Sequence, residues 1–251
     1  MPETPSALAA APTGSEQQAG SLPAYGGTSS KALNPDIGMI GNFLGAVGSS
    51  KGSDSVAPFP SLTLQESEAS FQAIVDPYAR ADFFLAIGEE GIEVEEGYVS
   101  FPTVPGGLLI KAGKMRANFG RLNAFHNHTL PWVDRPLVMF NLLGGATDDP
   151  DKGWSKREAP SGPQHAFGGF VSTDYRLDRR WFFGGRYDWS DRARQATVRD
   201  TGFSVVATFW PSEFTRLRGQ YRRTRFGDGA TANEFLFQTL FTIGAHGAHP
   251  F

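Results

Sequence analysis

The chain has 251 residues, a formal net charge of −3 at pH 7 and no cysteine. These values exclude a disulfide framework and a thiolate metal site, and the slightly acidic balance gives no support for nucleic acid as a partner. The 21 phenylalanines, 30 glycines and 17 prolines favour many strands joined by turns, while every apolar run is far shorter than the roughly 18 residues of a membrane-spanning helix.

The first 34 residues are predicted to form a flexible leader. Residues 1–34 are rich in Ala, Ser, Gly, Pro and Gln, and they hold too little apolar surface to pack as a core. They lack the basic start and the apolar stretch of an export signal. Residues 6–11, Ser-Ala-Leu-Ala-Ala-Ala, are compatible with the tail of a cleavage region. We therefore expect either a start further upstream or a processed chain.

From residue 34 onward the sequence alternates between apolar and polar residues, which is the pattern of strands with one apolar face. In one such segment Phe83 and Leu85 alternate with Arg80 and Asp82. Gly, Pro or Asp residues mark the turns between segments. The predicted strands are residues 36–47, 62–75, 78–87, 92–101, 108–116, 166–176, 180–190, 202–210, 215–225 and 233–244.

The length of these segments distinguishes a membrane barrel from a soluble sandwich. They are about ten residues long, which matches the roughly 9–11 residues of a tilted strand that crosses a bilayer. Strands of soluble proteins are typically about 5–6 residues long. A sheet in lipid must pair all its backbone groups and therefore close. The predicted fold is all-β: an antiparallel up-and-down transmembrane β-barrel of about ten strands, covering residues 35–251.

Residues 117–165 interrupt the alternation. They contain two histidines, several prolines and an acidic run near residue 150. An irregular stretch of this length inside a compact domain is usually functional or mobile. We predict a long loop or a plug that folds into the barrel.

The polar faces of the strands divide by charge along the chain. Acidic side chains dominate the first half and arginines the second, so the lumen would have an acidic wall facing a basic one and would select ions by charge. Ordinary solvated strand faces are the alternative. The predicted lumen-lining residues are Glu66, Glu68, Arg80, Asp82, Glu96, Arg186, Arg216, Arg218 and Arg222.

Two histidines in the irregular stretch are the best candidates for metal ligands. His126 and His128 lie two residues apart, so in an extended segment both imidazoles point the same way. Asp134 could add an oxygen ligand, and such a set suits zinc. The alternative is a pair of loop histidines that are solvated or bonded to backbone. His246 and His249 form a second pair near the chain end.

A further acidic cluster surrounds the turn near residue 89. The cluster could bind cations at a pore mouth or could simply solubilise a loop; it comprises Glu89, Glu90, Glu93, Glu95 and Glu96.

The sequence has no nucleophile elbow, P-loop or other catalytic signature. We therefore expect no enzymatic activity.

Two blocks of sequence resemble a known family. Residues 75–101 read VDPYARADFFLAIGEEGIEVEEGYVSF and residues 111–138 read KAGKMRANFGRLNAFHNHTLPWVDRPLV. Together with the chain end FLFQTLFTIGAHGAHPF they resemble Gram-negative porin-like outer-membrane proteins, some labelled zinc-regulated outer-membrane protein. The resemblance implies an outer-membrane location in contact with lipid. It also makes Phe251 the signal read by the barrel-assembly machinery.

This chain departs from that family between residues 144 and 178, where the family is expected to have more strands. The chain thus resembles an internally shortened member. Ten strands would enclose little lumen, since eight strands are just filled by their own side chains. The resemblance implies a porin-like channel for passive diffusion of small solutes or ions. The alternatives are a zinc-binding barrel and a structural barrel without transport; the solute and the oligomeric state stay open.

Overall fold

The computed structural model describes residues 35–49, 62–88, 91–116, 122, 125–143, 165–193 and 195–244. The predicted leader at residues 1–34 lies outside these ranges. So do Glu89, Glu90, His246, His249 and Phe251, and for Glu66 the backbone but not the side chain is described.

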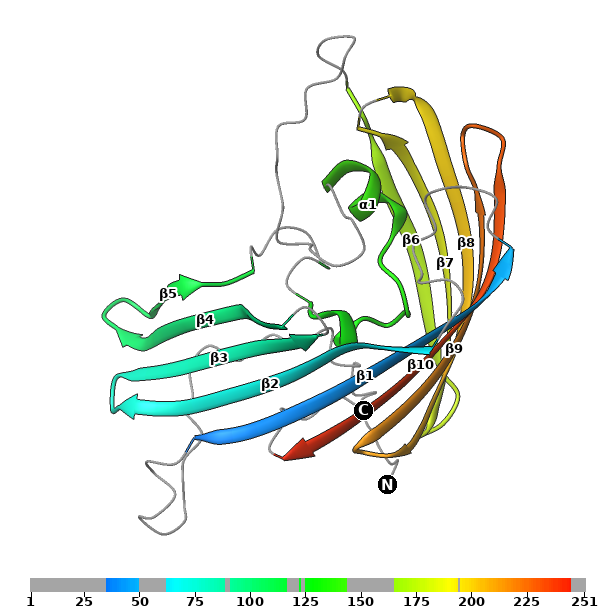
Figure 1. Cartoon of the computed structure of the whole chain (residues 1–251). Helices are drawn as coiled ribbons and strands as arrows, with labels where there is room; N and C mark the ends of the chain where they lie inside the picture. The colour runs from blue at the N-terminus through cyan, green and yellow to red at the C-terminus, as the bar shows by residue number, and fades with distance from the viewer. Residues whose placement is uncertain are drawn as a thin grey trace, which may run out of the picture.

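Ten antiparallel strands make up one curved sheet in the described part of the chain (Figure 1). They are β1 (Asp36–Ser49), β2 (Leu62–Asp76), β3 (Ala79–Gly88), β4 (Gly91–Val104), β5 (Leu108–Lys114), β6 (Gly168–Arg176), β7 (Trp181–Arg192), β8 (Gln195–Ser212), β9 (Thr215–Arg225) and β10 (Thr231–Gly244). Their order is β5-β4-β3-β2-β1-β10-β9-β8-β7-β6, so the first and last strands are neighbours. The predicted all-β, up-and-down architecture is confirmed.

The observed strands overlap all ten predicted segments, and the largest difference is at the start of β8. That strand begins at residue 195, seven residues before the predicted start. Its first part pairs with the end of β7 through ion pairs: Arg199 Nε lies 2.8 Å from Asp191 Oδ1, and Asp200 binds Arg192 at 3.0 Å. Ala196 and Val198 are the only apolar residues that alternate here before Gly202, so period-two hydrophobicity marks this part of the hairpin weakly and the ion pairs extend it.

The sequence leaves open whether ten strands close as one barrel, and in the described part of the chain the sheet is open between β5 and β6. Among the described strands these two have a pairing neighbour on one side only. Residues 125–143, which lie between them in sequence, include η1 (Asn127–Thr129) and α1 (Leu137–Leu143) and lie on the concave side of the sheet (Figure 1). A small barrel is nearly filled by its own side chains, and here residues 125–143 also pack against the concave side.

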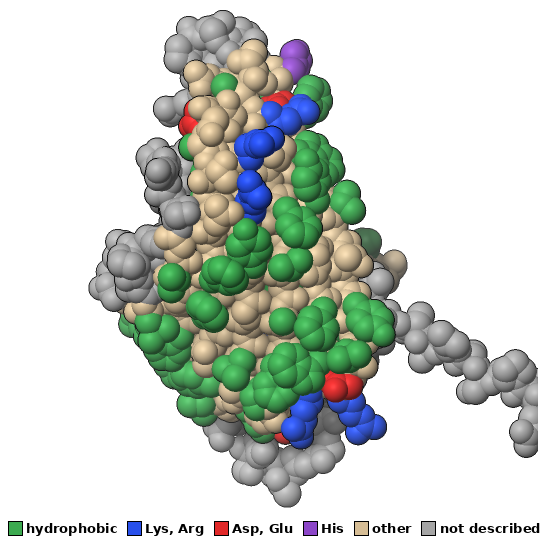
Figure 2. Space-filling view, turned by 90° about the vertical axis from the view of Figure 1, so that its right-hand side faces the viewer, with side chains coloured by type: hydrophobic (Ala, Val, Ile, Leu, Met, Phe, Trp, Pro, Cys, Tyr) green, Lys and Arg blue, Asp and Glu red, His purple; other side chains and the backbone are tan. Residues whose placement is uncertain are grey.

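The two faces of the sheet have opposite polarity. Along β10, Phe235, Phe237 and Ile243 are exposed on the convex face, whereas Glu234 and Gln238 are buried on the concave face. Figure 2 shows hydrophobic side chains spread across the convex side. Exposed apolar residues on other strands of this side include Val171, Phe183, Tyr187, Phe203, Val205 and Leu217. This arrangement is the reverse of a soluble barrel and is typical of a sheet that faces lipid.

No helix among the described residues is long and apolar enough to cross a bilayer. The apolar core is small and lies between the concave face and the segment that covers it. One cluster joins Leu44 and Leu236 to Val133, and a second joins Val206 to Leu130 and Trp132. Packing therefore fixes this segment to the inside of the sheet.

The polarity of the sheet predicts a depth-dependent response to charge on the convex face. Phe237→Arg, in the middle of β10, should lower the free energy of unfolding from phospholipid vesicles by about 2–4 kcal/mol. Ile243→Arg, one residue from the strand end, is the matched control and should cost about 0–1 kcal/mol. Denaturant titration of both variants measures the difference. Equal costs at the two positions would contradict contact of this face with lipid.

Candidate functional site

Residues 125–143, here called the plug, fill the concave side of the sheet. Trp132 is almost fully buried, and its ring meets Phe170 of β6 edge-on with 5.5 Å between centroids. The guanidinium of Arg186 lies 4.7 Å from the centre of the same indole, within the range of a cation–π contact. The largest side chain of the plug is thus held by both an aromatic ring and a charge.

Arginines of β9 bind the irregular backbone of the plug. Arg216 Nη2 donates to the carbonyl of His128 at 2.6 Å, and Arg218 Nη1 donates to the carbonyls of Leu130 and Trp132 at 2.6 and 3.0 Å. Carbonyl groups that are buried outside helices and strands need such partners. These arginines, predicted to line the lumen, therefore lie on the concave side of the sheet, where they donate hydrogen bonds to the plug.

Asp134 is the centre of the plug's ionic contacts. Its carboxylate accepts hydrogen bonds from Arg186 at 3.0 Å, from Arg222 at 2.7 Å and from the Gln220 amide at 2.6 Å. All of these side chains are buried. Four arginines on this half of the sheet, here called the basic wall, are Arg186, Arg216, Arg218 and Arg222.

The electrostatics around Asp134 keep it ionised. Burial alone would raise the pKa of this carboxyl, but the adjacent Arg186 and Arg222 guanidinium groups outweigh burial and lower the pKa to about 2. Arg222 also binds Glu234, its cross-strand neighbour on β10, and Arg186 binds Asp188 at 2.7 Å. Every buried charge in this network therefore has an opposite partner, as burial requires.

His126 occupies the corresponding position against the acidic half of the sheet. Its Nδ1 lies 2.7 Å from a carboxylate oxygen of Glu68 and 2.7 Å from one of Glu95, and its Nε2 lies 3.0 Å from Glu96. The acidic side chains on this half, here called the acidic wall, are Glu68 on β2, Asp82 on β3, and Glu95 and Glu96 on β4. Burial alone would lower the pKa of His126, but hydrogen bonds to the three glutamates raise it to about 11.

Two consecutive glutamates face the same side of the sheet because β4 contains a bulge. The register with β3 shifts between Phe84 and Leu85, so Glu95 has no direct partner while Glu96 pairs with Phe84. A bulge of this kind turns an additional side chain toward one face. Strict alternation placed Glu95 with Glu93 on one face, and thus missed its contact with His126. Arg116, whose guanidinium binds Glu95 at 2.6 Å, was also missed.

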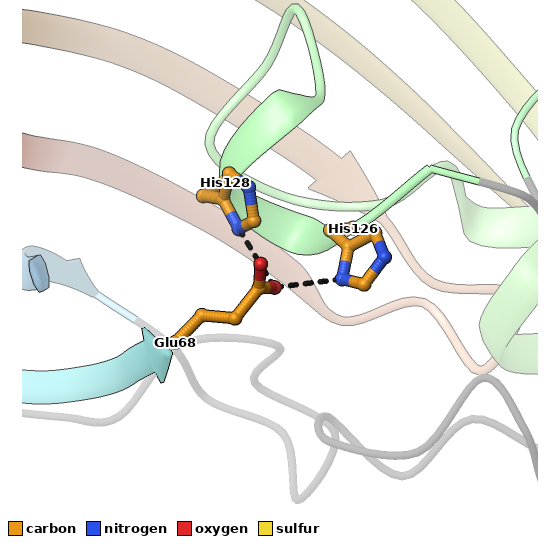
Figure 3. Close-up of side chains that lie close together, drawn as sticks. All are labelled: Glu68, His126 and His128. Carbon is orange, nitrogen blue, oxygen red and sulfur yellow. Dashed lines mark ion pairs between the residues drawn. The ribbon is translucent and has the colours of Figure 1, made fainter. Parts of the chain in front are cut away.

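The structure brings some of the predicted site residues together and keeps others apart. His126, His128 and Glu68 converge, with one ligand atom from each lying within 4.8 Å of the others (Figure 3). Asp134 is not part of this group, because the two guanidinium groups of the basic wall hold it. Arg80 and Asp82 lie on the same wall as Glu68 and pair with each other at 2.8 Å. Glu66 lies outside the described side chains.

Removing the charge of Asp134 should destabilise the folded protein. Asp134→Asn leaves two buried guanidinium groups without their shared anion, a change that costs about 3–5 kcal/mol. Glu213→Gln makes the same chemical change in the exposed turn after β8 and should have almost no effect. The free energy of unfolding in denaturant checks both. An equal, small effect of the two substitutions would show that Asp134 does not anchor the plug.

The lowered pKa of Asp134 also predicts a pH dependence. A carboxyl whose pKa is lower in the folded protein than the ordinary 3.8 contributes stability above about pH 4, and this stability is lost as the pH falls toward about 2. Unfolding of the wild type and of Asp134→Asn should therefore be measured across this window. The gap in stability between them should shrink as the pH falls; a gap that stays constant would contradict the pKa shift.

Comparisons with known proteins support the fold. No family model matches the chain. An uncharacterized protein of Aquifex aeolicus is 37% identical over 83 residues, which are 33% of this chain and 18% of that protein. The chain thus matches less than a fifth of that relative's length.

Solved structures resemble the chain more widely. OmpT, an outer membrane protein of Vibrio cholerae, aligns with a TM-score of 0.51 at 9% identity, covering 83% of this chain and 97% of OmpT. The outer membrane channel DcaP of Acinetobacter baumannii covers 86% of this chain and 99% of its own at 10% identity, with a TM-score of 0.42. None of these proteins is described as zinc-regulated. The match to OmpT shows that the chain has the antiparallel sheet fold of outer-membrane barrel proteins.

Proposed function

We propose that this chain is an outer-membrane channel for small solutes or ions, with the plug as its resting gate. One observation carries the proposal: the convex face is apolar and exposed, while the concave face is charged and buried. A membrane barrel has this distribution because lipid surrounds it and its lumen is polar. The proposal includes the outer-membrane lipid as surroundings and the barrel-assembly machinery as the partner for insertion.

The charges on the concave face are arranged as a channel would need them. The acidic wall and the basic wall come from opposite halves of the sheet, and rings or walls of one charge select ions in pores. In the resting state the plug matches both walls, with His126 against the glutamates and Asp134 against the arginines. Displacing the plug would therefore expose two charged walls to the solute.

The open edge between β5 and β6 adds a requirement for insertion in a membrane. Unpaired backbone N–H and C=O groups of an edge strand cost several kcal/mol each in lipid. A chain inserted in the membrane therefore has to pair these two edges. β5 and β6 run in opposite directions in the strand order, so antiparallel closure is geometrically compatible with the sheet.

Planar-bilayer recording tests the channel and the gate together. The wild type should give discrete but infrequent conductance steps. Asp134→Asn should raise the open probability at least about tenfold, because each 1.4 kcal/mol of lost anchoring changes the population tenfold. Glu213→Gln serves as the control and should behave as the wild type.

Two outcomes would contradict the proposal. Protein that is folded and inserted but silent in all three forms would exclude a channel and leave a structural barrel. Equal open probability in the wild type and Asp134→Asn would exclude the plug as the gate.

A further inference from the structure

Three side chains from the plug and the acidic wall converge on one point. Figure 3 shows His126 and His128 directed toward the carboxylate of Glu68. Glu68 Oε2 lies 2.7 Å from Nδ1 of His126 and 3.6 Å from Nδ1 of His128. The side chains of Glu68 and His128 are only 2% exposed, and that of His126 is 12% exposed. The group is therefore a built, buried cluster rather than a chance surface arrangement.

We propose that Glu68, His126 and His128 bind one divalent transition-metal ion between β2 and the plug. Zinc binds imidazole nitrogen and carboxylate oxygen at about 2.0–2.2 Å in a tetrahedral arrangement. Ligand atoms in such a site are about 3.3 Å apart. Glu68 Oε2 lies 2.7 and 3.6 Å from the two histidine nitrogens, and all three ligand atoms lie within 4.8 Å of one another, so the side chains have to rotate toward a common point to bind the ion.

Two imidazole nitrogens and one carboxylate oxygen form a donor set that suits zinc, cobalt, nickel or copper, whereas calcium and magnesium prefer oxygen ligands alone. Three protein ligands leave the fourth position of a tetrahedral ion to water. Glu95 lies beside the group, since its Oε2 is 2.7 Å from Nδ1 of His126, and the bulge in β4 brings it there.

Glu96 provides the orienting contact that metal-bound histidines need. It lies 3.0 Å from Nε2 of His126, on the side of the ring away from Nδ1. A carboxylate that accepts a hydrogen bond from one ring nitrogen fixes the tautomer and directs the other nitrogen to the metal. Glu96 and His126 already have this carboxylate–histidine arrangement, with the ligand position at Nδ1.

Charge balance favours a doubly charged ion at this point. Glu68, Glu95 and Glu96 bring three negative charges into one buried cluster, and Arg116 compensates one of them. A divalent ion compensates the other two, and the proton between His126 and the carboxylates passes to the buffer. The ion would join β2 to the plug and would hold the plug against the acidic wall.

Metal titration of the full chain folded in detergent tests the site, and it does so without reference to conduction. The chain has five histidines. The triple variant His165→Ala/His246→Ala/His249→Ala removes all of them except the pair, and His165 is exposed. Added Co²⁺ should give the absorption of a tetrahedral site at one ion per chain, and Zn²⁺ should displace it.

Substitution of single ligands in that background decides the assignment. Glu68→Gln and His128→Ala should each weaken Co²⁺ binding by at least about 10–100-fold, because removing even a hydrogen-bond partner of a metal ligand causes a loss of this size. Gel mobility with and without heating confirms that each variant is folded, and using two variants guards against one that fails to fold. The proposal would be overturned if Glu68→Gln and His128→Ala bind Co²⁺ as tightly as the triple histidine variant does. It would also be overturned if the triple variant itself binds no Co²⁺.

Discussion

The position of the plug depends above all on one carboxylate. Asp134 is held by Arg186 and Arg222, and these two arginines are in turn paired with Asp188 and Glu234. Arg216 and Arg218 are held by carbonyl groups of the plug, whereas carboxylates offset the buried guanidinium groups of Arg186 and Arg222, as burial of charge requires. The basic wall thus requires an anion at its centre, and the plug supplies that anion. Trp132, two residues earlier, is placed by the same contact and fills the space beside Arg186.

The opposite end of the plug follows the same rule with reversed sign. The acidic wall gathers carboxylates of β2 and β4, and His126 brings a positive charge to them. The plug therefore has its basic end at the acidic wall and its acidic end at the basic wall. A plug with the reverse order of charges would meet like charges at both ends. This matching explains how an irregular segment of the chain takes one defined position inside the sheet.

The strands were predictable from the sequence because lipid imposes a simple pattern: apolar outward and polar inward over about ten residues. Contacts that break this pattern could not be predicted from the sequence. The bulge that turns Glu95 inward needs the register with β3, and the early start of β8 rests on ion pairs rather than on apolar residues. His126 and His128 were found from their spacing. Asp134 was grouped with them by proximity in sequence, whereas its partners Arg186 and Arg222 lie more than fifty residues further along the chain.

The plug and the open edge express one geometric constraint. Ten strands enclose little more than their own side chains need, yet the concave face here also holds Trp132, the histidine pair and α1. In this structure the plug and the open edges occur together. Insertion in a membrane would therefore require the sheet to pair its edges while the plug stays on the concave face, because unpaired edge strands are costly in lipid.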